Sequence, residues 1–326
     1  MKLNTRLLHT GQVIVDLVMA VDQLPSSGGD VLAHSAAFEV GGGFNVMAAA
    51  QRNGLPVTYL GRHGTGRFGD LARQAMAAEG IRMALKPDAD SDTGLCVALT
   101  DARAERTFIS HIGAEGGLSA EDLARVQVRD DDYIYVSGYS LLQPNKARTL
   151  LDWLLALPRE VIVVFDPGPL VDSPQIPAMA ALLTRIDIWT SNAVEAQRFT
   201  RTTDIGAALE SLALELPDPA LLVVRDGPHG CWIRVAGQVE HVPGFKVQAV
   251  DSNGAGDAHA GVFLAALSNG MTSGEAARRA NAAAAIAVTR WGPATAPGSD
   301  EVDAWLGGAD PEKLTGIHGT TFSLPD

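Results

Sequence analysis

Short apolar runs recur along the chain, and each run ends in a small or polar residue. Continuous apolar runs of this kind are typical of strands that are buried on both faces, as in a parallel sheet. Segments with helical character separate most of the runs, which predicts an α/β doubly wound fold with a mostly parallel sheet. The predicted strands end at Asp16, Gly61, Gly138, Asp166, Asn192 and Gly227, and the predicted helices span 44–53, 69–79, 145–156, 175–185 and 204–216.

Two stretches interrupt this alternation. Residues 17–40 read as two extended segments around a turn, and residues 94–111 read as a hairpin around "DARAE". Both emerge near predicted strand ends on the ligand side, so we expect a small β-sheet lid over a ligand site, although two ordinary surface hairpins would give the same pattern. The predicted main domain comprises 1–16, 41–93 and 112–306, followed by a loose tail over 307–326.

Ligands of doubly wound folds bind beyond the carboxyl ends of the strands. Asp16, Asn192 and Asp226 end or directly follow predicted strands. We therefore expect their side chains along the ligand-binding edge of the sheet.

Charge and composition exclude several classes of function. The 326 residues carry a formal net charge of −13 with no Lys/Arg cluster, which argues against nucleic-acid binding. No apolar run approaches the roughly 20 residues of a membrane-spanning helix, and the N-terminus lacks a signal-peptide pattern, so a cytoplasmic protein is expected. Cys96 and Cys231 are far apart in the sequence and are interpreted as idle thiols.

The segment "GTGRFG", residues 64–69, matches the G-x-G-x-x-G pattern of dinucleotide-binding turns. The acidic residue that should end the next strand is missing. A glycine-rich loop without a cofactor is the favoured interpretation, and a nicotinamide-dependent oxidoreductase is an unfavoured alternative.

The segment "DSNGAGDAHAG", residues 251–261, carries the strongest chemical signal. It follows "FKVQAV", a predicted strand over 245–250, and leads into an apolar helix. The backbone N–H groups of residues 254–257 would point at one spot that suits an anion. Asp257 would repel a stably bound anion, but it could take a proton from a hydroxyl that receives a phosphoryl group. The pattern therefore favours a general base beside an anion hole.

Five segments together resemble the ribokinase (PfkB) family of carbohydrate kinases. Residues 251–261 are similar to the family's D-T-x-G-A-G-D-x-F-x-G signature, and "GGGFNVMAAAQRNG" from Gly41 resembles its G-G-x-x-x-N-x-A stretch. "NAVE" at 192–195 matches N-x-x-E, "RDGPHG" at 225–230 stands at the nucleotide loop, and 281–292 resembles the adenine-side helix and turn. The matching segments occur in the same order as in the family, from about residue 11 to about 306. Within the family, the sequence resembles unassigned bacterial sugar kinases more than ribokinase itself.

The resemblance implies a role for each matching position. For catalysis it implies Asp257 as the base and an anion hole of Gly254, Ala255 and Gly256. For the sugar hydroxyls it implies Asp16, Gly42, Gly43 and Asn45. For the nucleotide it implies Asn192, Arg225, Gly227, Gly230 and Asn281.

The resemblance also implies the cofactors, which are ATP and Mg²⁺. Glu195 would act indirectly on Mg²⁺, and Asp251 with Asn253 could shape a site for a monovalent cation such as K⁺. Arg225 replaces the family's Thr and His259 replaces its Phe; we interpret His259 as a packed core residue, with substrate contact as the alternative. Asn192 and Glu195 also fit an ordinary helix capping box.

These observations predict an ATP-dependent kinase acting on a primary hydroxyl of a pentose-like sugar, sugar acid or ribonucleoside. A sugar-phosphate kinase is an alternative that would use cations such as Arg62 or Arg106, although Arg106 is more easily interpreted as a solvated lid charge. A non-catalytic sugar or nucleotide sensor is a second alternative. The apolar segments "LCVAL" and "TFIS" predict a homodimer joined through the lid.

Overall fold

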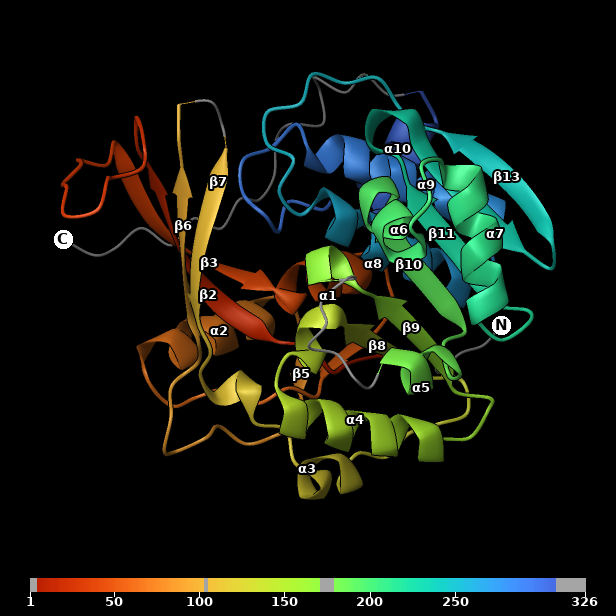
Figure 1. Cartoon of the computed structure of the whole chain (residues 1–326), viewed down its shortest axis with the longest axis horizontal. Coiled ribbons are helices and arrows are strands. Elements are labelled where there is room, and N and C mark those ends of the chain that lie inside the picture. The colour runs from red at the N-terminus through yellow and green to blue at the C-terminus, as the bar shows by residue number, and fades with distance from the viewer. Residues whose placement is uncertain (1–4, 103–104, 171–178, 309–326) are drawn as a thin grey trace.

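The structure is a computed structural model that describes residues 5–102, 105–170 and 179–308. The described part of the chain contains two sheets of different size, with helices packed around the larger one (Figure 1). The larger sheet has nine strands, and the smaller sheet has four.

The large sheet confirms the predicted doubly wound architecture. Its strands follow the order β13-β12-β11-β10-β9-β8-β1-β4-β5, and all neighbours are parallel except for β12 and β13, which extend one edge as an antiparallel pair. The strands are β1 (Leu7–His9), β4 (Val57–Tyr59), β5 (Arg82–Met83), β8 (Tyr133–Ser137), β9 (Ile162–Asp166), β10 (Ile188–Asn192), β11 (Leu221–Arg225), β12 (Gly230–Val235) and β13 (Gln238–Pro243).

Helices cover both faces of the large sheet, which is why its central strands read as unbroken apolar runs. On one face, alternate strand residues such as Tyr135 pack with α1, α2, α8 and α9; on the other face, Ile134 and Val136 pack with α4 and α7. The helices are α1 (Gly43–Arg52), α2 (Arg67–Ala78), α3 (Ala120–Ala124), α4 (Pro144–Ala156), α5 (Met179–Leu183), α6 (Ala193–Thr200), α7 (Ile205–Glu215), α8 (Ala255–Ser268), α9 (Ser273–Ala287) and α10 (Ser299–Leu306). Part of the helix expected over 175–185, and most of the predicted tail, lie outside the described residues.

The small sheet brings together the two stretches that interrupt the alternation. Its order is β3-β2-β6-β7, formed by β2 (Val13–Ala20), β3 (Ser35–Gly42), β6 (Leu95–Thr100) and β7 (Arg106–His111). The sheet stands beside the main body at one side of the molecule (Figure 1).

The predicted place of Asp16 in the large sheet is wrong. Asp16 lies within β2, where it pairs with Glu39 of β3 and Cys96 of β6. The small sheet therefore includes residues 13–16 and 41–42, which were predicted to belong to the main domain. The large sheet uses β1 instead, whose three residues are all buried. Because β2 continues the apolar run past Asp16, the sequence pattern gave no sign of the change of sheet.

The strand predicted over 245–250 is also absent. Strand β13 ends at Pro243, which has no N–H for a further ladder bond, and the chain leaves the sheet at Gly244. Of its apolar residues, Phe245 packs edge-on against Trp305 of α10, with ring centroids 6.2 Å apart, whereas Ala249 and Val250 are exposed. The segment thus reaches α8 as an irregular connection.

Candidate active site

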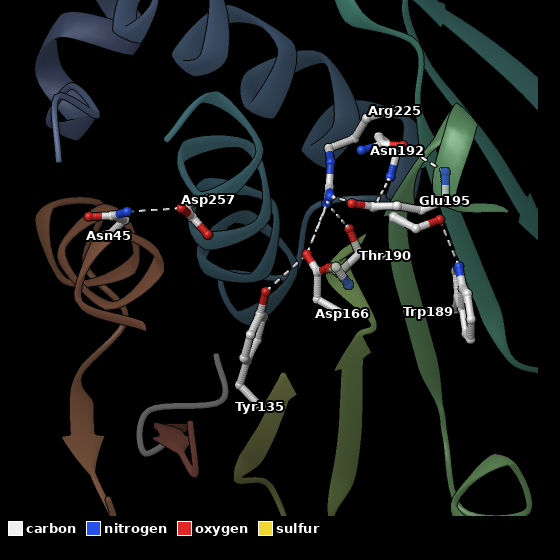
Figure 2. A network of polar contacts seen from close by, with 11 residues as sticks. Asn45, Tyr135, Asp166, Trp189, Thr190, Asn192, Glu195, Arg225 and Asp257 are labelled. Atoms are coloured by element: carbon white, nitrogen blue, oxygen red, sulfur yellow. Dashed lines mark hydrogen bonds and ion pairs between the residues drawn. The ribbon is translucent and has the colours of Figure 1, made fainter. Parts of the chain in front are cut away.

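The carboxyl ends of β9, β10 and β11 meet the N-terminus of α8, and polar side chains from all four elements gather there (Figure 2). Asn192 and Arg225 end neighbouring strands and are paired in register, while Asp166 ends the next strand. Asp226 directly follows β11, as expected from the sequence. The structure thus brings the predicted Asn192, Arg225 and Asp257 together at the carboxyl-terminal edge of the large sheet.

The turn that opens α8 depends on Gly254. Its φ is 73°, a left-handed conformation, and a Cβ at this position would lie 1.7 Å from the carbonyl oxygen of Pro293. Only glycine fits both conditions. Within the described residues, no side chain caps the N-terminus of α8, although the Ala255 N–H donates to the carbonyl oxygen of Ser252 at 3.3 Å.

The helix that follows "GTGRFG" is different. The backbone amides of Phe68 and Gly69, at the start of α2, donate to the two carboxylate oxygens of Asp92 at 3.0 and 2.8 Å. Asp92 therefore already provides the anion for this helix N-terminus. The N-terminus of α2 is therefore occupied, whereas in the described part of the chain α8 begins without a side-chain cap, as α1 and α4 also do.

Asp257 lies in the first turn of α8 and is held by α1. The side-chain amide Nδ2 of Asn45 donates to Asp257 Oδ2 at 3.0 Å (Figure 2). The two helices can approach closely because Gly261 of α8 packs against the backbone of α1, where a Cβ would lie 2.5 Å from the carbonyl oxygen of Val46. Burial raises the pKa of Asp257 to about 6, partly offset by the Asn45 hydrogen bond.

Asn45 also offers an open acceptor. Its Oδ1 is buried and has no hydrogen-bond partner within the described part of the chain. Buried polar atoms are normally satisfied, so this oxygen suits a hydroxyl donor from a ligand.

Asp16 and Glu39 face each other across the β2–β3 pair. Burial raises the pKa of Asp16 to about 6, and the neighbouring Glu39 carboxylate adds to this shift. The Asp16 carboxylate lies against Gly41, close to the predicted Gly42 and Gly43 at the start of α1. Glu39 was missed from the sequence, because only the strand register brings it opposite Asp16.

Arg225 is the centre of a buried polar network (Figure 2). Its Nη1 donates to Thr190 Oγ1 at 2.6 Å, and both Nη atoms lie 3.3 Å from Asp166 Oδ2. Nη2 lies 3.9 Å from Glu195 Oε2, and Tyr135 donates to the same Asp166 oxygen at 3.2 Å. Asp166, Thr190 and Tyr135 were not among the predicted site residues.

Asn192 and Glu195 form the capping box of α6. Asn192 Oδ1 accepts from the Glu195 backbone N–H and Glu195 Oε2 accepts from the Asn192 backbone N–H, each at 2.8 Å. Burial and the neighbouring Asp166 raise the pKa of Glu195, and Arg225 opposes that shift. The Glu195 carboxylate therefore caps the helix and also faces the polar network.

Asp251 joins the small sheet to the turn before α8. Its Oδ1 accepts from the Asn253 backbone N–H at 2.9 Å and pairs with Arg106 of β7, and its Oδ2 accepts from Gly292 N–H at 3.2 Å. Although burial raises the pKa of Asp251, these hydrogen bonds outweigh it and the net shift is downward. The interpretation of Arg106 as a solvated charge is therefore wrong: it forms an ion pair between β7 of the small sheet and the turn before α8.

The remaining predicted residues make structural contacts. Asn281 donates to the carbonyl oxygens of Val242 and Pro243 at 2.9 and 3.2 Å, which ties α9 to the end of β13. Gly227 lies in the short 3₁₀ turn between β11 and β12, and Gly230 follows it with φ 100°. His259 is buried and nearly parallel to the ring of Phe263, and burial lowers its pKa to about 3, which agrees with a packed neutral core residue.

The two cysteines are free and buried, as expected. Within the described residues, no three His, Cys, Asp or Glu side chains are grouped so that they could hold a metal ion by themselves. None of the described helices combines the length and apolar character needed to cross a membrane.

Comparison with known proteins identifies the class of this protein. The model of the pfkB family of carbohydrate kinases matches residues 4–299, and the chain therefore belongs to that family. An Escherichia coli K12 protein named as an uncharacterized sugar kinase, YegV, is 30% identical over 306 residues, which cover 92% of this chain and 94% of that protein.

Two further relatives extend the comparison. A Halopiger xanaduensis protein named as an ATP-dependent ribose-1-phosphate kinase is 28% identical and covers 92% of this chain and 98% of its own length. The fold matches the E. coli structure described as a putative ribokinase II in complex with ATP and Mg²⁺, with a TM-score of 0.78, 23% identity, and coverage of 93% of this chain and 99% of that one.

Proposed function

We propose that this carbohydrate kinase transfers the γ-phosphate of ATP to a primary hydroxyl of a pentose-like sugar, a sugar acid or a ribonucleoside. The observation that carries the proposal is the pairing of Asp257 with the uncapped N-terminus of α8. A base and an anion site on adjacent residues suit phosphoryl transfer to a hydroxyl. A sensor that only binds a ligand would not need the base.

In this mechanism Asp257 accepts the proton of the attacking hydroxyl. Its pKa of about 6 leaves it ionised at neutral pH and more basic than an ordinary Asp. Asn45 holds the carboxylate in place, and its free Oδ1 accepts a hydrogen bond from the acceptor. The N-terminal amides of α8 stabilise the negative charge of the transferring group.

The residues present fit a Mg²⁺ ion beside the nucleotide. Asp166 and Glu195 offer carboxylate oxygens, the donor type that Mg²⁺ prefers, and the described protein groups alone are too few to enclose it. When bound, Mg²⁺ would neutralise phosphate oxygens. Asp251 already has the Arg106 guanidinium as its counter-charge, so the proposed mechanism needs no K⁺ at Asp251 and Asn253.

We expect Glu195→Gln to raise the Mg²⁺ concentration for half-maximal rate severalfold while leaving the Tm close to wild type. Gln can still accept the Asn192 N–H in the capping box, but it carries no charge to attract Mg²⁺. The matched control is Glu275→Gln, which alters the same kind of capping box in α9, at an exposed position. A lower Tm with an unchanged Mg²⁺ dependence would show that Glu195 acts only as a cap.

Two observations favour a sugar over a sugar phosphate. Arg62 is held by Asp122 at 2.8 Å and Asp88 at 3.2 Å, and Arg106 is paired with Asp251. Neither cation is left to receive an acceptor phosphate, although one relative bears the name of a ribose-1-phosphate kinase. An ADP-release assay over sugars, sugar acids, nucleosides and sugar phosphates tests this proposal. Release with only a sugar phosphate would favour the alternative, and no release with any acceptor would favour the sensor.

We also propose that the small sheet acts as a lid and joins two copies in a homodimer. Phe108 and Ile109 of its edge strand β7 are 57% and 65% exposed, an apolar surface that a partner sheet would cover. Closure would exclude water, which competes with the acceptor for the phosphoryl group.

Amide hydrogen exchange in β2, β3, β6 and β7 should slow when the acceptor that supports ADP release is added. The reason is that Asp16 of the lid would bind the acceptor while Arg106 fixes the lid to Asp251. Solution scattering should report a dimer. A monomer with unchanged exchange in these strands would contradict both parts of the proposal.

A further inference from the structure

Arg225 lies between the proposed Mg²⁺ site and the proposed phosphate site. Its guanidinium faces Asp166 and Glu195, the carboxylates that fit Mg²⁺, and it also borders the first turn of α8. A Cβ built on Gly256 would lie 3.5 Å from Cζ, Nε and Nη2 of Arg225. The guanidinium therefore lies beside the first turn of α8, whose backbone would bind the transferring phosphate.

The contacts of Arg225 with the carboxylates are loose for a buried arginine. Both Nη atoms share a single oxygen of Asp166 at 3.3 Å, and the contact with Glu195 is 3.9 Å long. A bidentate arginine–carboxylate pair would use both oxygens at about 2.7–2.9 Å. The short bond of Arg225 goes to the neutral Thr190 hydroxyl, at 2.6 Å.

The charges around Arg225 do not balance. Asp166, Glu195 and Asp257 all interact electrostatically with its guanidinium, and Arg198 acts on Glu195 as a second, smaller positive influence, so the carboxylates still outnumber the cations. A divalent cation at Asp166 and Glu195 would correct this deficit, and it would at the same time repel a guanidinium only a few ångströms away. The nearest new partner for Arg225 would be the phosphate at the N-terminus of α8.

We propose that Arg225 is an exchangeable counter-charge. Its guanidinium neutralises Asp166 and Glu195 in the ligand-free protein and turns to the transferring phosphate when a divalent cation takes over those carboxylates. No covalent step is involved; one ion pair replaces another. This inference rests on the proposed phosphotransfer at α8. It adds that Arg225 and the divalent cation compete for the same carboxylates. Arg225 stands where the nucleotide loop of the family has Thr.

The test compares wild type with Arg225→Gln and Arg225→Lys. Binding of Mn²⁺, a probe for the divalent site, is measured by electron paramagnetic resonance without nucleotide. Arg225→Gln should bind Mn²⁺ at least about tenfold more tightly, because the competing like charge is gone. In the presence of acceptor and Mg²⁺-ATP, its kcat should fall by about 10²- to 10³-fold, since a donor to the transition state is lost.

Arg225→Lys keeps the charge and should leave Mn²⁺ affinity near wild type, which separates charge from any general disturbance of the fold. Arg62→Gln is the matched control, since Arg62 also bridges two carboxylates but outside this network. Unchanged Mn²⁺ affinity in Arg225→Gln, with only a lower Tm, would overturn the inference. Failure of wild type to bind a nonhydrolysable Mn²⁺-ATP analogue would overturn the proposed function as well, and the two failures are thus distinguishable.

Discussion

Replacing Asp257 with Asn should lower kcat by about 10²- to 10⁴-fold while nucleotide binding survives, because a positioned general base typically contributes that much. The substitution keeps the shape of the side chain and an oxygen that can accept from Asn45. Steady-state kinetics measures the loss, and calorimetry measures nucleotide binding. Asp300→Asn is the control, an exposed first-turn carboxylate of α10 outside the site.

The assignment of Asp257 as the general base also predicts how kcat/KM depends on pH. The base must be deprotonated to act, and burial raises the pKa of Asp257 to about 6. The kcat/KM of the wild type should therefore be level above this value and fall by at least tenfold per pH unit below it, because the pKa of Asp16, which would bind the acceptor, is also raised to about 6. A variant that retains near-normal turnover, or a wild-type profile without an acid limb, would reject Asp257 as the base.

Gly254→Ala should reduce kcat by about 10²-fold or more, since the anion site is built on this turn, and should lower the Tm by several degrees. Alanine at φ 73° costs about 1–3 kcal/mol in backbone strain. Its Cβ would also overlap the carbonyl oxygen of Pro293, so the turn must shift. Thermal unfolding and kinetics measured together test both effects.

Gly270→Ala is the matched control for this prediction. Gly270 has φ 84° at the other end of α8, but a Cβ there would meet no atom within 4 Å. It should share the cost in backbone strain and leave kcat unchanged. If the two variants behave alike, the close approach of Gly254 to Pro293 has no functional meaning.

The sequence was sufficient where short-range patterns decide the structure. The apolar runs predicted most strands of the large sheet, and the glycine-rich turn with Asp257 predicted the helix N-terminus that the structure leaves uncapped. These features depend on residues close together in the chain. For the same reason Asn192 and Glu195 could be predicted as a capping box.

The sequence was insufficient where distant segments meet. Arg106 and Asp251 are 145 positions apart, and Arg225 and Asp166 are 59 apart, so neither ion pair leaves a local signal. The apolar run through Asp16 fits either sheet, and only strand pairing places it opposite Glu39. The alternation at 245–250 does not mark a strand, although Phe245 there packs on Trp305 of α10.

The most direct test of the account follows the phosphoryl group itself. Protein in excess is mixed with ATP labelled at the γ-phosphate and the acceptor found by ADP release, and the label is located after a single turnover. We expect label on the acceptor with the wild type, and label that remains on bound ATP with Asp257→Asn. Transfer to the acceptor at a near-normal rate by Asp257→Asn, or label covalently attached to the protein, would contradict it.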